Sequence, residues 1–217
     1  MALNSVNVFK GALVSTPATA SSFLTDNSTV IPFQYNPENM QRSVKPNMAG
    51  GESQDRTLAV MYKGPPVQTI TIVIEFDAST GLENGDETEL KHGVYAQLAA
   101  LELLLTPTTK AILKTHKQLT KGQIEITPFT TPNIYFVWGP SRVLPVKIEN
   151  YSVDEQGFDV NLNPIKANVT LNLTVLNCSD VAQENQAYSQ YITYQQNMEE
   201  IAKSAYSSDW AKINKVK

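Results

Sequence analysis

The residue types that most often carry out chemistry in enzymes are few in this sequence and form no familiar pattern. There are two histidines, His92 and His116, and one cysteine, Cys178. A nucleophilic hydrolase needs a serine, cysteine or threonine beside a positioned base, and the sequence contains no G-x-S-x-G motif. One cysteine and two histidines are too few for a Cys/His zinc site or an internal disulfide. We therefore expect no catalytic residues, no metal and no cofactor.

Carboxylates are the remaining candidates for chemistry. Glu83, Asp86, Glu87 and Glu89 form an acidic group whose oxygens could bind calcium, but their spacing is not that of an EF-hand loop. Runs of charge are usually solvated faces, and we interpret this one in that way. A hydrolase would need paired carboxylates with separated pKa values in a cleft, and no spacing in the sequence suggests such a pair.

The overall charge argues against several partners. The 217 residues carry a net charge of −4, and charged residues make up 18% of the chain, below the usual ~25%. No basic stripe is present that would bind a nucleic-acid backbone. No apolar run approaches the ~20 residues that span a bilayer, and no signal-peptide h-region precedes the alanine-rich stretch near Ala18. We expect that the protein binds no nucleic acid and does not insert directly into a membrane. We expect it to assemble in the cytoplasm.

Alternation of apolar and polar residues predicts a chain rich in β-strands. The clearest strand is 67–77, in which isoleucines and a phenylalanine alternate with mostly polar residues, and 168–176 is nearly as regular. Further strands are predicted at 6–14, 30–35, 123–127, 134–138 and 144–153. Loops are predicted at 43–56 and 81–89.

Two segments have helical periodicity. Val94, Leu98, Leu101 and Leu105 recur at helical spacing within 93–105, and a weaker stripe predicts a terminal helix over 188–205. The pattern predicts a mainly β protein, an antiparallel sandwich or barrel with one mid-chain helix and a C-terminal helix. We divide it into a β domain with an N-terminal arm, 1–178, and a helical extension, 179–217.

Three passages carry a family resemblance. They are Phe33-Gln34-Tyr35-Asn36-Pro37-Glu38, the segment Pro-Asn-Ile-Tyr-Phe-Val-Trp-Gly at 132–139, and 144–176, which includes Phe-Asp-Val-Asn-Leu-Asn-Pro-Ile-Lys-Ala at 158–167. In order and spacing they resemble the tube-like domain of contractile injection system proteins, related to the tail tube initiators of phage-like particles. The resemblance covers most of 28–178.

The motif residues also have a structural interpretation. Asn36-Pro37 and Asn163-Pro164 are turn formers. The bulky residues Phe33, Phe136, Trp138 and Phe158 are of the kind that fill a core. We therefore expect these residues to build the fold more than to contact partners. The motif residues are Phe33, Tyr35, Asn36, Pro37, Phe136, Trp138, Gly139, Phe158, Asn163 and Pro164.

The resemblance implies a tube-type fold whose copies form a hexameric ring around a channel. A polar strand face would line this lumen, and the two predicted loops would reach neighbouring rings. The candidate faces are Thr69, Thr71 and Glu75, or Asn168, Thr170, Asn172 and Thr174. Longer relatives carry a LysM module, which segments around Ile201 and Trp210 resemble only in part.

The function implied is structural and not enzymatic. A hexameric ring at the inner baseplate would join the spike to the inner tube and template tube assembly, with the tube protein, the spike and other baseplate subunits as partners. The alternative is a monomeric β-sandwich that binds a ligand or acts as an adhesin. Oligomeric state distinguishes the two.

Overall fold

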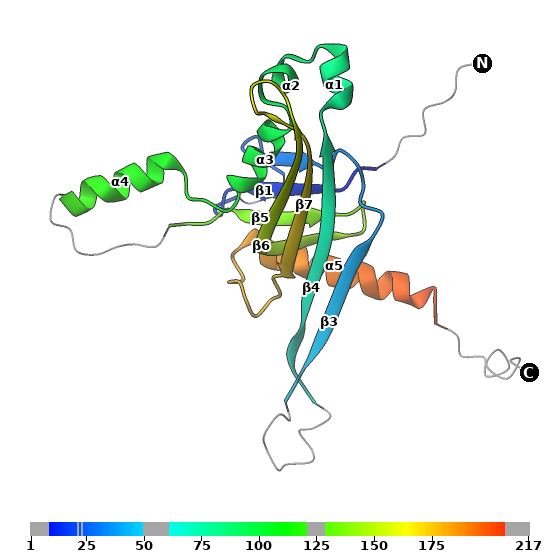
Figure 1. Cartoon of the computed structure of the whole chain (residues 1–217). Coiled ribbons are helices and arrows are strands. Elements are labelled where there is room, and N and C mark those ends of the chain that lie inside the picture. The colour runs from blue at the N-terminus through cyan, green and yellow to red at the C-terminus, as the bar shows by residue number, and fades with distance from the viewer. Residues whose placement is uncertain (1–8, 21, 23, 50–60, 121–128, 207–217) are drawn as a thin grey trace, which may run out of the picture.

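The computed structural model describes residues 9–20, 22, 24–49, 61–120 and 129–206, and shows a tall sheet with helices at its upper end and at its base (Figure 1). Its strands are β1 (Ala12–Thr16), β2 (Thr29–Pro32), β3 (Met40–Met48), β4 (Tyr62–Asp77), β5 (Asn133–Val137), β6 (Val143–Phe158) and β7 (Pro164–Val175). Its helices are α1 (Ser79–Asn84), α2 (Glu87–His92), α3 (Tyr95–Glu102), α4 (Thr109–Thr120) and α5 (Gln186–Lys203).

The strands form one continuous antiparallel sheet in the order β2-β1-β5-β6-β7-β4-β3. Strand β6 changes partner: Val143–Val146 pair with β5, and the strand from Val146 onward pairs with β7. A register shift between Ile148 and Asn150 follows this change, and such a bulge bends a strand. The bend divides the sheet into a short part, β2-β1-β5, and a tall part, β6-β7-β4-β3, which runs across it (Figure 1). The mainly β antiparallel fold is confirmed, whereas a sandwich or barrel is not.

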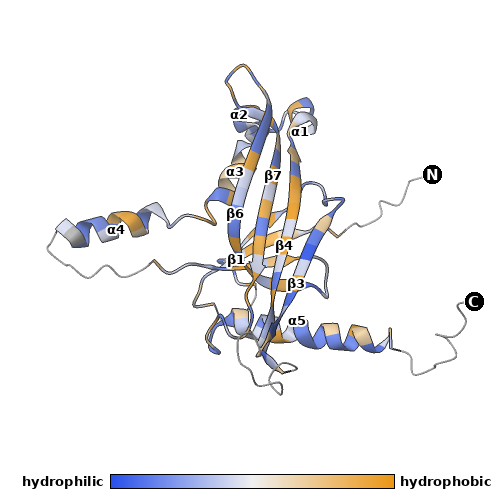
Figure 2. Cartoon of the chain, turned by 60° about the horizontal axis from the view of Figure 1, so that its bottom comes forward, coloured by the Kyte–Doolittle hydropathy of each residue, from blue (hydrophilic) through white to orange (hydrophobic). Residues whose placement is uncertain are grey.

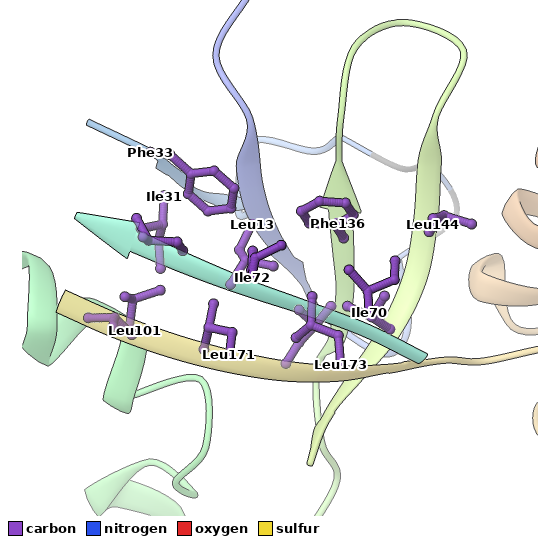
Figure 3. Close-up of a cluster of buried hydrophobic side chains, with 14 of the residues drawn as sticks. Leu13, Ile31, Phe33, Ile70, Ile72, Leu101, Phe136, Leu144, Leu171 and Leu173 are labelled. Carbon is purple, nitrogen blue, oxygen red and sulfur yellow. The ribbon is translucent and has the colours of Figure 1, made fainter. Parts of the chain in front are cut away.

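Both parts of the sheet share one hydrophobic core. Leu13, Phe33 and Phe136 of the short part face Ile72 and Leu171 of the tall part (Figure 3), and all five are buried. Burial of each such side chain contributes roughly 1.5–3 kcal/mol. The alternation predicted for 67–77 arises because every second residue of β4 enters this core.

Six of the seven predicted strands are confirmed by a strand among the described residues, with differences in extent. Strand β4 begins at Tyr62, five residues before the predicted start, and it pairs with β3, which occupies the first part of the predicted loop 43–56. The first strand is Ala12–Thr16, later than the predicted 6–14. The predicted strand 123–127 lies outside the described residues.

The expectation of one mid-chain helix is wrong, because the described residues between β4 and β5 contain four helices. The predicted helix corresponds to α3. The predicted loop 81–89 instead contributes to α1 and α2, where the Asp86 side chain accepts hydrogen bonds from the N–H groups of Thr88 and Glu89. Helices α1 and α2 bury no residue, so they carry no apolar stripe that periodicity could reveal.

The C-terminal helix is confirmed as α5, with Asn185 as its N-cap. Its first half packs against the sheet, and Tyr191 and Tyr194 join the same core as the strands. Among the described residues, none of the helices is long and apolar enough to cross a lipid bilayer.

Candidate assembly surface

The two polar strand faces proposed for a lumen lie side by side on the outer face of the tall sheet. The β4–β7 register places Thr69 opposite Thr174, Thr71 opposite Asn172 and Glu75 opposite Asn168, and Thr170 lies opposite Val73. The Thr71 hydroxyl donates a hydrogen bond to Oδ1 of Asn172 at 3.0 Å. These residues are exposed or half-buried, and the residues that alternate with them are buried. Figure 2 shows this alternation as a change of colour along β4 and β7.

The polar surface extends across all four strands of the tall part. On β6, Lys147, Asn150, Ser152 and Asp154 lie opposite the polar residues of β7, and on β3, Gln41 and Ser43 lie opposite those of β4. Most of these side chains are uncharged. We call this four-stranded surface the polar wall.

Both edges of the polar wall are open in the described part of the chain. Strand β3 pairs only with β4, and β6 beyond Val146 pairs only with β7. Edge strands present unpaired N–H and C=O groups, which are a template for pairing with another chain. The wall can therefore be extended by a further strand on either side.

Asn36 ties the start of the described chain to the sheet. Its Oδ1 accepts a hydrogen bond from the N–H of Gly11 at 2.8 Å, and its Nδ2 donates to the carbonyl of Phe9 at 2.9 Å. The N–H of Phe33 donates to the carbonyl of Gly11 at 2.8 Å. The Asn36-Pro37 turn thus has a structural role in this protein.

Three motif aromatic residues form one cluster. The Phe33 and Phe136 ring centroids are 6.3 Å apart, and the Phe136 and Trp138 rings stack at 5.8 Å. A Cβ atom at Gly11 would approach the rings of Phe33 and Trp138 to 2.7 Å, so only glycine fits there. Gly139 follows the cluster with φ +80, in the left-handed region that favours glycine.

Two aromatic residues of the motifs have exposed side chains. Tyr35 is exposed, and Phe158, at the end of β6 beyond the core, is 52% exposed. The expectation that Phe158 fills the core is therefore wrong. Its exposure leaves it free to contact another molecule.

Asn163 and Pro164 fasten the β6–β7 turn to the helices beside it. Oδ1 of Asp159 accepts from the N–H groups of Asn161 and Asn163, and the Asn163 Nδ2 donates to Asp159 Oδ2 at 2.9 Å and to the carbonyl of Lys91 at 3.0 Å. The hydrogen bonds from Asn163 lower the pKa of Asp159. The carbonyl of Pro164 accepts a hydrogen bond from the N–H of Val94. The neighbouring Gly93 has no Cβ, which permits the Pro164 carbonyl to lie this close.

The same turn presents two apolar residues that the motif analysis did not single out. Val160 is 98% exposed and Leu162 is 80% exposed. Leu162 has φ +64, a conformation that is unfavourable for a residue with a Cβ. The sequence did contain a signal for their exposure, because Val160 and Leu162 are apolar residues within a turn formed by Asp159, Asn161 and Asn163.

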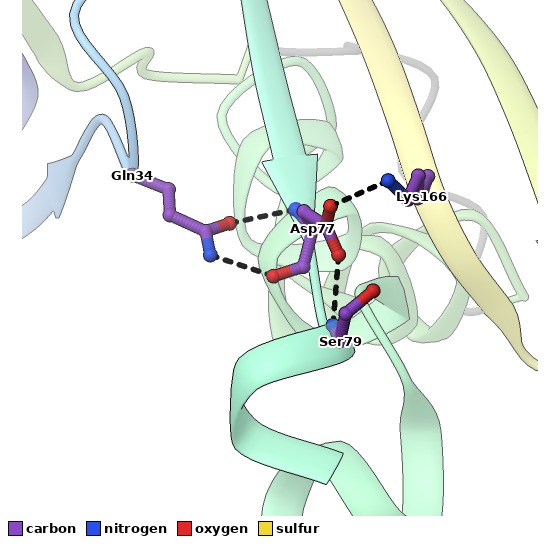
Figure 4. Close-up of polar contacts among 4 residues, drawn as sticks. All are labelled: Gln34, Asp77, Ser79 and Lys166. Carbon is purple, nitrogen blue, oxygen red and sulfur yellow. Dashed lines mark hydrogen bonds and ion pairs between the residues drawn. The ribbon is translucent and has the colours of Figure 1, made fainter. Parts of the chain in front are cut away.

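Asp77 joins three segments at the upper end of β4 (Figure 4). Its Oδ2 lies 2.7 Å from the Lys166 Nζ, and its Oδ1 accepts from the Ser79 N–H at 2.8 Å. The Gln34 side chain bonds both the N–H and the carbonyl of Asp77. Hydrogen bonds from Lys166 and then from Ser79 lower the pKa of Asp77 to about 2. The network fixes the ends of β4 and β7 to the segment after β2.

Glu89 is the carboxyl group best suited to acid–base chemistry. Burial, and then the nearby charges of Asp86 and Asp77, raise its pKa. It lines a cavity of about 460 Å³ between β2 and α3, together with Gln97 and Lys10. Within the described residues, no group of three His, Cys, Asp or Glu side chains could hold a metal ion.

No model of a known protein family matches the chain, and no curated protein shows significant sequence similarity to it.

Proposed function

We propose that the chain is a structural subunit of a contractile injection system, a phage-tail-like particle. Six copies form a ring of the inner baseplate that joins the spike to the inner tube and templates tube assembly. The observation that carries this proposal is the polar wall: both polar strand faces expected to line a lumen belong to one surface with two open edges.

A ring follows from this wall if the β3 edge of one copy lies beside the free β6 edge of the next. Such a contact joins two different surfaces, and heterologous contacts of this kind close into a ring when the rotation from copy to copy completes a full turn. Strand β3 is nine residues long, and every second residue directs its backbone groups to the free edge, where each added backbone hydrogen bond contributes about 0.5–1.5 kcal/mol net. The joined walls would surround the channel with threonine, serine and asparagine side chains, which water or a moving cargo can wet.

The motif residues fit this role because they hold the wall in shape. The aromatic cluster around Phe136 fills the core behind the wall, and Asn163 fixes the turn at its upper end. On this proposal the motifs are structural, and the surfaces that contact other subunits lie at the edges and tips.

A second candidate function is a monomeric module that binds an apolar ligand. One observation favours it: a cavity of about 390 Å³ on the β3–β4 hairpin, lined by Val44, Pro46, Asn47, Tyr62, Gly64 and Pro66. Its described lining is mostly apolar, as in pockets for small molecules.

Proline substitutions on β3 separate the two functions. Successive residues of an antiparallel strand direct their N–H groups to opposite sides, so one of Arg42→Pro and Ser43→Pro removes only an outward N–H. We expect circular dichroism to show that this variant keeps its fold. The other variant loses a backbone hydrogen bond to β4 and is the matched control. If the wild type has the mass of a hexamer in solution, the folded variant is expected to be smaller. A wild type that stays monomeric at high concentration overturns the proposal and favours the ligand-binding module.

A further inference from the structure

Helix α4 has no partner within the described chain that could explain why it is folded. It stands off the sheet in Figure 1, and it makes at most marginal contact with any other described helix or strand. It has 12 residues, and an isolated helix of that length is marginal in water. Its Ile112 and Leu113 side chains are 36% and 56% exposed. A surface that covers Leu113, the more exposed of the two, would stabilise the helix.

The charges of α4 indicate what such a surface must carry. Lys110, Lys114 and Lys117 follow one another at spacings of four and three residues, so they share one face of the helix. The helix contains no carboxylate, although the whole chain has a net charge of −4. The partner surface should therefore be acidic, with apolar side chains exposed beside the carboxylates.

The upper end of the molecule has this chemistry. We call α1, α2 and the β6–β7 turn together the acidic tip. Glu83 and Glu87 are exposed on its helices, Leu90 is 50% exposed, and Val160 and Leu162 project from the turn. The hydrogen bond from Asn163 to the carbonyl of Lys91 holds the turn against α2, so these features lie close together. Leu162 is exposed and held in a strained conformation, as expected of a residue that is fixed in position for contact with a partner.

We propose that α4 of one copy docks on the acidic tip of a second copy of this chain. Leu113, which adjoins the lysine face of α4, packs against Leu90 and Leu162, and the lysines lie opposite Glu83 and Glu87. A second copy is favoured as partner because the two surfaces complement each other in charge and both expose apolar side chains. This contact extends the proposed function, and its place in a ring rests on that proposal. The contact itself can be observed with only two copies of the chain.

Charge reversal on each surface tests the contact. The first variant carries Lys110→Glu and Lys114→Glu, and the second carries Glu83→Lys and Glu87→Lys. Each variant alone has like charges on both surfaces, and we expect its self-association to weaken at least about tenfold in low salt, measured by sedimentation. A one-to-one mixture is expected to recover, because each surface then meets its opposite on the other variant. Lys63→Glu with Lys203→Glu, both exposed lysines outside the contact, is the control of equal charge change.

Three results would overturn the inference. Rescue only when all four substitutions are in one chain would mean that α4 folds onto its own tip. Loss of binding to phosphatidylserine vesicles in the first variant, with unchanged self-association, would assign α4 to a membrane surface. Normal hexamers from both variants would remove this contact and leave the ring proposal standing, whereas a monomeric wild type would overturn the ring proposal itself.

Discussion

Replacement of Asp77 with asparagine should destabilise the protein in a way that depends on pH. The Asp77 carboxylate pairs with Lys166 at 2.7 Å and accepts a hydrogen bond from Ser79, and these contacts lower its pKa from 3.8 to about 2. A carboxyl whose pKa is lower in the folded state stabilises the fold at pH values above its unfolded pKa. That stabilisation is lost as the pH falls through the folded pKa. Asp77 therefore contributes fully above pH ~4 and little near pH 2.

The structure sets the size of the effect. The interval between 3.8 and about 2 corresponds to about 2.4 kcal/mol, at about 1.4 kcal/mol per pH unit. Half of the Lys166 side chain is exposed, so solvent screens the pair. We therefore expect Asp77→Asn to lower the free energy of unfolding by roughly 1 kcal/mol at pH 7.

Urea unfolding of the wild type and Asp77→Asn at pH 7, 4 and 2.5 measures this difference. Glu184→Gln, which removes an exposed carboxylate just before α5, is the control for a general loss of charge. A difference that shrinks as the pH falls agrees with the geometry of Figure 4. Equal stability of the two proteins at pH 7, or a difference that persists undiminished at pH 2.5, would refute the reasoning.

Three further substitutions test the packing. Gly11→Ala should cost about 1–3 kcal/mol in thermal unfolding, because its Cβ would overlap two aromatic rings, and an unchanged melting temperature would contradict this packing. Phe136→Ala should cost about 3–5 kcal/mol and the exposed motif residue Phe158→Ala less than about 1 kcal/mol, and similar losses would contradict the assigned burial. Leu162→Gly should stabilise the isolated chain by up to about 1 kcal/mol through relief of its positive φ, and a lower melting temperature would argue against the strain.

Much of the sheet was predictable because burial on one face leaves a mark in the sequence. Strand β4 from Gln68 onward and β7 from Ala167 onward alternate strictly, since every second residue enters the core. Strand β3 was missed because almost all of its residues are exposed and no alternation remains. Helices α1 and α2 were missed because they bury no residue and so show no apolar periodicity. The start of α2 is fixed by the side chain of its N-cap, Asp86.

The polar wall was only partly predictable. Alternation identified the polar faces of β4 and β7, but not that they adjoin, because this depends on pairing between residues as far apart as Thr71 and Asn172. Of the four aromatic residues expected in the core, Phe33 and Phe136 are buried and Trp138 packs against the core, whereas Phe158 is exposed. The exposed Val160 and Leu162 were not singled out, although they lie between the turn-forming residues Asp159 and Asn163, whose hydrogen bonds build the turn that exposes them.

The central claim is that copies of this chain form a ring within an injection particle. Electron microscopy of particles purified with the chain tagged at its C-terminus tests it most directly, read together with the mass of the isolated protein. The account predicts a sixfold ring at the spike end of a sheathed particle, with the polar wall facing the channel. A strictly monomeric protein that is absent from any such particle would contradict it.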